Sequence, residues 1–151
     1  DEEQSSGRCW RRLRGFSAFE FGQNQRVLFI DLDMMILDDI TPIFQKFESD
    51  PFVIADDSIC EGSKYNGSFI LFTPTPTTHR MWSNFHADPE KCKHLLRTKG
   101  WIGTDQAWIR FYLDEIAHYP VKVIGADDGL LSFRWHCQDR KVDPFDAGAR
   151  L

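Results

Sequence analysis

The stretch that decides the fold is residues 26–37, which read Arg26-Val27-Leu28-Phe29-Ile30-Asp31-Leu32-Asp33-Met34-Met35-Ile36-Leu37. The apolar run before the first aspartate predicts a strand over 27–30, buried on both faces as in a covered parallel sheet. Because side chains alternate along a strand, Asp31 and Asp33 should point to the same side. Two carboxylates at a buried strand end are costly unless a positive charge neutralises them. A hard divalent cation bound through oxygen would do so, and two solvated acids at a turn are the alternative.

Composition places the chain among packed globular proteins. Its 151 residues are enough for one domain with a sizeable core, and 42% of them are hydrophobic. The net charge of -5 gives no broad basic field for nucleic acid or for an anionic membrane. No apolar run reaches the roughly 18 residues that span a bilayer. The four cysteines stand singly, without a Cys-x-x-Cys pair, which favours reduced thiols and a cytoplasmic location over a zinc cage.

The remaining pattern alternates predicted strands with predicted helices, which indicates an α/β domain. A helix is expected from Arg8 to about Phe21, with Trp10, Leu13, Ser17 and Phe21 on its apolar face. Residues 34–37 should continue extended, and residues 65–68 should form a turn before a strand over 69–72. A further helix should begin after Thr104 as its N-cap.

Several of these stretches together resemble the GT-A glycosyltransferases, most closely glycosyltransferase family 8 and its bacterial and phage relatives. The run into Asp31 and Asp33 is similar to the Asp-x-Asp strand of that family. The further matching segments are Trp10-Arg11-Arg12-Leu13, Tyr65-Asn66-Gly67-Ser68-Phe69-Ile70-Leu71, Asp105-Gln106 and Leu131-Ser132-Phe133-Arg134-Trp135-His136-Cys137. No single motif is specific, so the resemblance rests on their order and spacing across roughly residues 8 to 150.

The resemblance implies a GT-A, Rossmann-like fold, with residues 1–7 as a polar N-terminal end and residues 8–151 as a partial glycosyltransferase domain. It implies metal-dependent transfer of a sugar from a nucleotide-diphosphate sugar, a UDP-sugar in particular. The acceptor would be a sugar, a lipid or a protein. The metal would be Mn²⁺ or Mg²⁺, which stabilises the charge that gathers on the leaving diphosphate.

The same resemblance assigns roles to six residues. Asp31 and Asp33 would ligate the metal, and Arg12 would join them in binding the donor. Asn66, Asp105 and Gln106 would form the catalytic group near the sugar. Three of these residues have a structural alternative: a solvated helix face for Arg12, a turn for Asn66, and ordinary capping at a helix start for Asp105.

Two departures from the family pattern predict that the domain is incomplete at both ends. The chain starts at the basic helix, whereas the family places a strand and a helix for the nucleotide base before it. No segment matches the His-Gly stretch whose histidine is the third metal ligand in the family. Exposed apolar surface is therefore expected beside Val27–Ile30 or at the carboxyl-terminal end, with little transfer activity from the chain alone.

Two other readings stay open. A haloacid-dehalogenase-like phosphatase also carries Asp-x-Asp after a buried strand, with the first aspartate, here Asp31, as the nucleophile. Those enzymes usually have Thr or Val two residues after the second aspartate, where this chain has Met35. The other reading is a non-catalytic remnant of a transferase that still binds sugar nucleotides.

Overall fold

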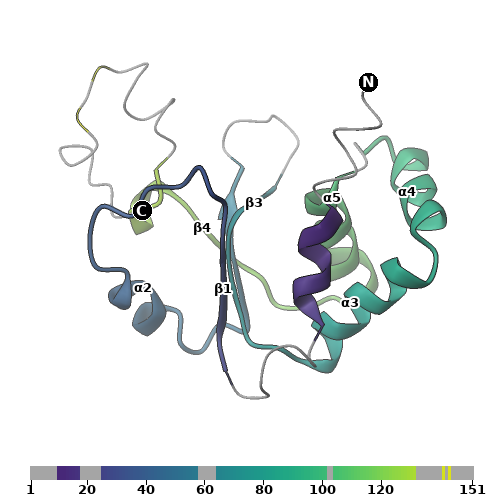
Figure 1. Ribbon diagram of the computed structural model, residues 1–151, viewed down its shortest axis with the longest axis horizontal. Helices are drawn as coiled ribbons and strands as arrows, with labels where there is room; N and C mark the ends of the chain where they lie inside the picture. Colours follow the sequence, from purple (N-terminus) through teal and green to yellow (C-terminus); the bar gives the residue numbers. More distant parts are fainter. Residues whose placement is uncertain are drawn as a thin grey trace. The chain divides into compact units, whose positions relative to one another are not determined.

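The computed structural model describes residues 10–17, 25–57, 64–101, 104–131, 141 and 143. The chain divides into two compact units, whose elements Figure 1 labels. The first, called here the helical unit, takes the described residues up to 27 together with 72–120. The second, called the sheet unit, takes residues 28–71 and those described from 121 onward. Helices and strands are mixed along the chain, which confirms the α/β class predicted from the sequence.

A four-stranded mixed sheet forms the frame of the sheet unit. Its strands are β1 (Val27–Ile30), β2 (Phe52–Asp56), β3 (Tyr65–Phe72) and β4 (Lys122–Ile124). They lie in the order β1-β3-β2-β4, so β1 stands at one edge of the described sheet. Strands β2 and β4 run parallel with Ala55 opposite Ile124. A parallel pair needs a long crossover, which here includes the whole middle of the chain.

One face of this sheet packs against α2 (Thr41–Lys46), which lies beside the strands in Figure 1. Side chains at alternating positions of the strands reach that face, because successive strand residues point to opposite sides. Pro42 fits the first turn of α2, where a backbone N–H is not needed. The shared core comprises Ile43, Phe47, Val53, Ala55, Phe69, Leu71, Ile124 and Leu130.

The strand predicted over Val27–Ile30 is confirmed, but its burial on both faces is wrong. All four of its residues are only half-buried, because β1 lies at an edge of the described sheet. The chain then turns, and the Met34 N–H donates to the Asp31 carbonyl at 3.1 Å. Residues 34–37 are not part of a strand, so the sheet does not continue through them. The exposed apolar surface expected here is present, on Leu32, Met35 and Ile36.

The turn predicted over residues 65–68 is wrong as well, because these residues are the first half of β3. Tyr65 and Gly67 are buried, whereas Asn66 and Ser68 are half-buried. This alternation is that of a strand with one covered face. Asn66 is therefore a strand residue and not the turn residue that its type suggested.

The first element of the helical unit is η1 (Trp10–Phe16), a 3₁₀-helix and not the α-helix predicted over this stretch. A 3₁₀-helix has three residues per turn, so every third residue shares a face. Its buried ridge is accordingly Trp10, Leu13 and Phe16. The predicted position Ser17 lies outside that ridge, and Phe21 lies outside the described residues.

The rest of the helical unit is α3 (Pro76–Ala87), α4 (Pro89–Thr98), α5 (Asp105–Arg110) and a π-helical continuation, η2 (Phe111–Ile116). Asp88 separates α3 from α4, and its Oδ1 accepts the Lys91 N–H at 3.0 Å as the cap of the second helix. Gly100 follows the end of α4 and adopts a left-handed conformation, with φ of 74°. The Trp108 indole N–H donates to the Met81 carbonyl at 3.1 Å, which ties α5 to α3.

Candidate functional site

Asp31 and Asp33 lie in the turn that directly follows β1. Asp31 is half-buried, and its backbone N–H donates to the Ser68 carbonyl at 2.9 Å, which extends the pairing with β3. Asp33 is exposed, two residues further along the turn. Because the strand ends at Ile30, side-chain alternation does not fix the directions of the two carboxylates, and their shared direction stays a prediction. In the turn, a single residue, Leu32, separates the two acids.

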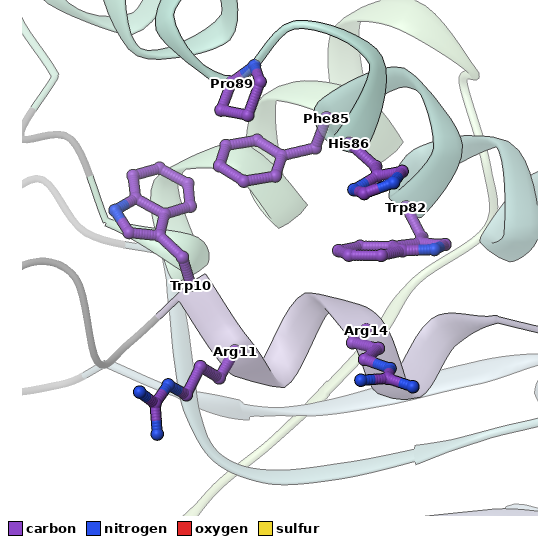
Figure 2. Close-up of a pocket in the computed structure, with 7 residues that line it drawn as sticks. All are labelled: Trp10, Arg11, Arg14, Trp82, Phe85, His86 and Pro89. Atoms are coloured by element: carbon purple, nitrogen blue, oxygen red, sulfur yellow. The ribbon is translucent and has the colours of Figure 1, made fainter.

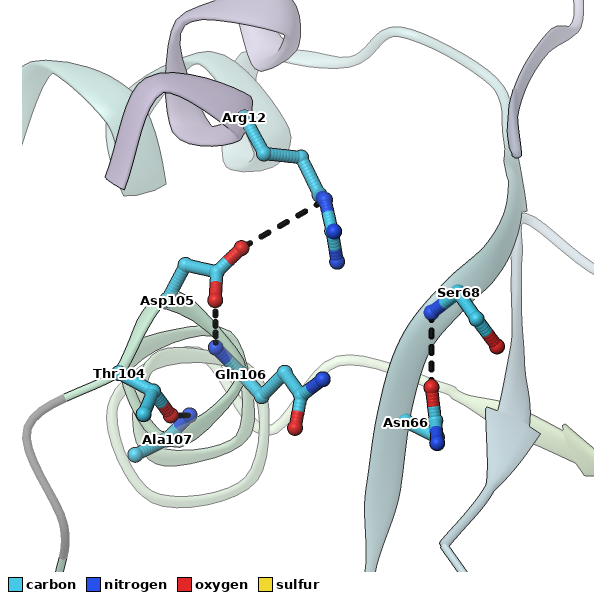
Figure 3. A network of polar contacts seen from close by, with 7 residues as sticks. All are labelled: Arg12, Asn66, Ser68, Thr104, Asp105, Gln106 and Ala107. Atoms are coloured by element: carbon cyan, nitrogen blue, oxygen red, sulfur yellow. Dashed lines mark hydrogen bonds and ion pairs between the residues drawn. The ribbon is translucent and has the colours of Figure 1, made fainter. Parts of the chain in front are cut away.

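Ser68 joins Asn66 to this turn. The Asn66 Oδ1 accepts the Ser68 backbone N–H at 2.8 Å, a bond drawn in Figure 3. The carbonyl of the same serine accepts from the Asp31 N–H. One residue of β3 therefore holds both the Asn66 amide and the start of the acidic turn. The sheet unit thus brings together three of the six predicted site residues.

Two further acids follow the turn, and they serve the start of α2. The Asp38 Oδ1 accepts the Asp39 N–H, and the Asp39 Oδ1 accepts the Thr41 N–H, each at 2.8 Å. Hydrogen bonds from Thr41, first from its side chain and then from its backbone, hold the pKa of Asp39 below its ordinary value. These two carboxylates are therefore engaged in the local structure at the start of α2.

The other predicted residues lie in the helical unit. Asp105, the first residue of α5, is 2% exposed, and its Oδ2 lies 3.5 Å from the Arg12 Nε of η1. Its Oδ1 accepts the backbone N–H of Gln106 at 3.0 Å, as Figure 3 shows. The surface alternative for Arg12 is thereby wrong, since its side chain is 21% exposed and paired with a buried carboxylate.

The start of α5 favours a carboxylate at this position. The Thr104 hydroxyl accepts the Ala107 N–H at 3.2 Å, which confirms the predicted N-cap. The positive end of the helix dipole stabilises a negative charge in the first turn. Gln106 follows in the same turn and is half-buried. Asp105 is therefore held by the helix terminus and by Arg12 together.

The six predicted residues thus form two groups. Asp31, Asp33 and Asn66 belong to the sheet unit, and Arg12, Asp105 and Gln106 belong to the helical unit. Asp31 and Asn66 are linked through Ser68, and Asp105 contacts both Arg12 and Gln106. The roles that the resemblance gives to both groups stay predictions.

The acidic turn has the chemistry that a hard divalent cation requires. Carboxylate oxygens are the ligands that Mg²⁺ and Mn²⁺ prefer, and the exposed Asp33 can rotate toward an ion without disturbing the core. Among the described residues, no group of three or more His, Cys, Asp or Glu side chains is arranged to hold a metal ion. A cation at this turn would therefore take two carboxylates here, with its other ligands coming from solvent or from a bound diphosphate.

Comparison with known proteins finds no matching family, no matching curated protein and no matching solved structure. None of the helices in the described part of the chain is long and apolar enough to cross a membrane.

Two features of these groups escaped sequence reasoning. The bridge through Ser68 depends on the register between β1 and β3, which local patterns do not reveal. The Arg12–Asp105 pair joins residues 93 positions apart in the sequence. The available signal was weak: an aspartate directly after the capping residue Thr104, and an arginine between the buried Trp10 and Leu13 of η1.

Proposed function

We propose that this chain is a metal-dependent glycosyltransferase of the GT-A type, which takes a sugar from a nucleotide-diphosphate sugar. The observation that carries the proposal is the acidic turn after β1, which the Ser68 backbone joins to Asn66. Two carboxylates in one turn, joined through Ser68 to the strand that carries Asn66, suit a donor that combines a diphosphate with a sugar. The mixed α/β architecture is compatible with this fold, and the order of motifs along the chain supports it.

In this function, Asp31 and Asp33 would hold a Mn²⁺ or Mg²⁺ ion, which supplies Lewis-acid stabilisation to the departing diphosphate. Asp31 is fixed by its backbone bond to Ser68, so it offers a preset ligand position. Asp33 lies in the exposed part of the turn and adjusts to the bound donor. The Asn66 side chain carries both donor and acceptor groups, which suit sugar hydroxyls.

The second group would orient the transferred sugar. Asp105 is buried against Arg12, so its position at the start of α5 is well defined. Gln106 beside it presents an amide, which does not titrate near neutral pH and acts by hydrogen bonding.

Calorimetric titration with UDP, with Mn²⁺ or with EDTA, tests this function. We expect binding that depends on Mn²⁺, and we expect Asp33→Asn to weaken it by about tenfold or more, because the amide removes a charged ligand. The matched control is Glu48→Gln, which neutralises an exposed carboxylate after α2 in the same unit. Equal UDP affinity in the parent and in Asp33→Asn, with Mn²⁺ present, would contradict the proposal.

The same proteins separate the transferase from the phosphatase reading. A phosphatase that uses Asp31 as its nucleophile should bind Mg²⁺ with aluminium fluoride, a phosphoryl analogue, more tightly than it binds UDP. A transferase should show the opposite preference. A panel of UDP-sugars, followed by release of free UDP, then reports whether the bound donor is also consumed.

A further inference from the structure

Residues 32–39, called here the apolar–acidic segment, lie between β1 and α2 of the sheet unit and expose large apolar side chains. Figure 1 shows this connection between the two labelled elements. Leu32 is fully exposed, and Met35 and Ile36 are 69% and 50% exposed. A single exposed apolar residue is ordinary, whereas several together, bordered by polar residues, mark an interaction surface.

The segment is held in place near both of its ends. Met34 and Ile40 pack against the core of the sheet unit. The Met34 N–H donates to the Asp31 carbonyl at 3.1 Å, and the Thr41 N–H donates to the Asp39 carboxylate at 2.8 Å. Because Met34 and Ile40 occupy the inward positions, the three exposed apolar side chains stay in contact with water unless a partner covers them.

Negative charge surrounds these apolar side chains. Asp33, Asp38 and Asp39 are exposed, and residues 31–40 contain no Lys, Arg or His. The described residues of the sheet unit include eleven Asp and Glu, but only four Lys and no Arg. A surface of this charge repels nucleic acids and anionic lipids, and it attracts Lys and Arg side chains.

The described part of the helical unit has a different surface. Its exposed large apolar residues are Leu95 and Ile116, which are 37% and 46% exposed and belong to separate elements. The pocket of this unit drawn in Figure 2 is lined by aromatic rings, by Pro89 and by Arg11 and Arg14, without a carboxylate. A ligand that is both apolar and basic should therefore prefer the apolar–acidic segment.

We propose that the apolar–acidic segment docks a basic, amphipathic peptide segment of another protein. The aliphatic side chains of the peptide cover the three exposed apolar residues, and its Lys or Arg side chains pair with the exposed aspartates. Methionine adapts its shape to a partner, which suits Met35 to this role. Complementary charge speeds association and excludes acidic partners. The proposal goes beyond the glycosyltransferase function and does not rest on it.

Fluorescence anisotropy of labelled synthetic peptides, titrated with the full chain, tests this docking. The measurement is made in EDTA, because Asp33 is also a candidate metal ligand. One peptide combines Leu and Lys at helical spacing, a second has Glu in place of Lys, and a third has Ser in place of Leu. We expect the Leu–Lys peptide to bind about tenfold more tightly than the other two, and added salt to weaken it.

Leu32→Ser combined with Met35→Ser should weaken binding of the Leu–Lys peptide by about tenfold or more, because the apolar centre of the contact is lost. Both side chains are exposed, so the variant should keep its fold, which circular dichroism checks. The matched control is Leu95→Ser combined with Ile116→Ser, which removes exposed apolar side chains from the helical unit and should leave the affinity unchanged.

Three results of the peptide titrations would overturn the proposal: equal affinity for the Leu–Lys peptide and either of the others, unchanged affinity in Leu32→Ser with Met35→Ser, or no binding at millimolar concentration. Sedimentation of the chain, alone and with phosphatidylcholine vesicles, covers the other occupants. Self-association or vesicle binding that disappears in the same variant would assign the segment to a second copy of the chain or to a lipid surface, and would also overturn the proposal.

Discussion

Replacing Phe16 by alanine is expected to lower the free energy of unfolding by about 3 to 5 kcal/mol, because the substitution leaves a cavity in a packed core. The Phe16 side chain is fully buried, and its ring lies 4.8 Å from that of Phe72 between centroids. It is the last member of the buried ridge of η1, together with Trp10 and Leu13. Denaturant unfolding of the parent and the variant measures the difference.

Ser17→Ala is the control for this prediction. Ser17 is only half-buried, and the hydrogen bond that its N–H donates to the Arg14 carbonyl is retained in the variant. Its loss of stability should therefore be small. An α-helix in register with Trp10 and Leu13 would bury position 17 in place of position 16. A larger loss for Ser17→Ala than for Phe16→Ala would contradict the three-residue repeat of this element.

Asp105→Asn is expected to destabilise the fold by about 2 to 3 kcal/mol. The variant removes the charge that neutralises Arg12 across 3.5 Å, and breaking a buried ion pair leaves one charge desolvated. It also removes a negative charge from the first turn of α5, where the helix dipole favours it. This expected loss of stability is smaller than that for a fully buried ion pair, because the Arg12 side chain is 21% exposed.

Glu90→Gln provides a matched comparison, since it makes the same carboxylate-to-amide change in the first turn of α4. Glu90 has the shorter contact, 2.8 Å to the Lys93 Nζ, but its side chain is 74% exposed. Exposed pairs contribute little to stability, so this variant should unfold almost as the parent does. Thermal unfolding of Asp105→Asn and Glu90→Gln shows which of the two variants is less stable. A greater loss of stability in Glu90→Gln than in Asp105→Asn would show that contact distance, and not burial, decides how much an ion pair contributes to stability.

Local patterns predicted much of the architecture. The apolar run before Asp31 predicted β1, and Thr104 was correctly expected to cap the helix that follows it. Such features depend on residues close together in the sequence, so propensity and capping chemistry suffice to predict them. The π-helical continuation η2 was not expected, because the apolar spacing over that stretch also fits an α-helix.

The features that sequence reasoning missed depend on packing between distant segments. Trp10 and Leu13 are three residues apart, a spacing that both α- and 3₁₀-helices allow, and Phe16 is what distinguishes them. The half-burial of β1 follows from its edge position, which the strand order sets. Ser68 links Asn66 to the acidic turn through two hydrogen bonds, and this link depends on the register between β1 and β3.

The central claim is that Asp31 and Asp33 bind a divalent metal ion together with a sugar nucleotide. Paramagnetic broadening of backbone amide signals in ¹H–¹⁵N spectra, recorded with UDP and substoichiometric Mn²⁺, tests it most directly. The account expects selective broadening at Asp31, Asp33 and Asn66, and its disappearance in Asp33→Asn. Broadening confined to residues far from the turn after β1, or persisting unchanged in Asp33→Asn, would contradict the account.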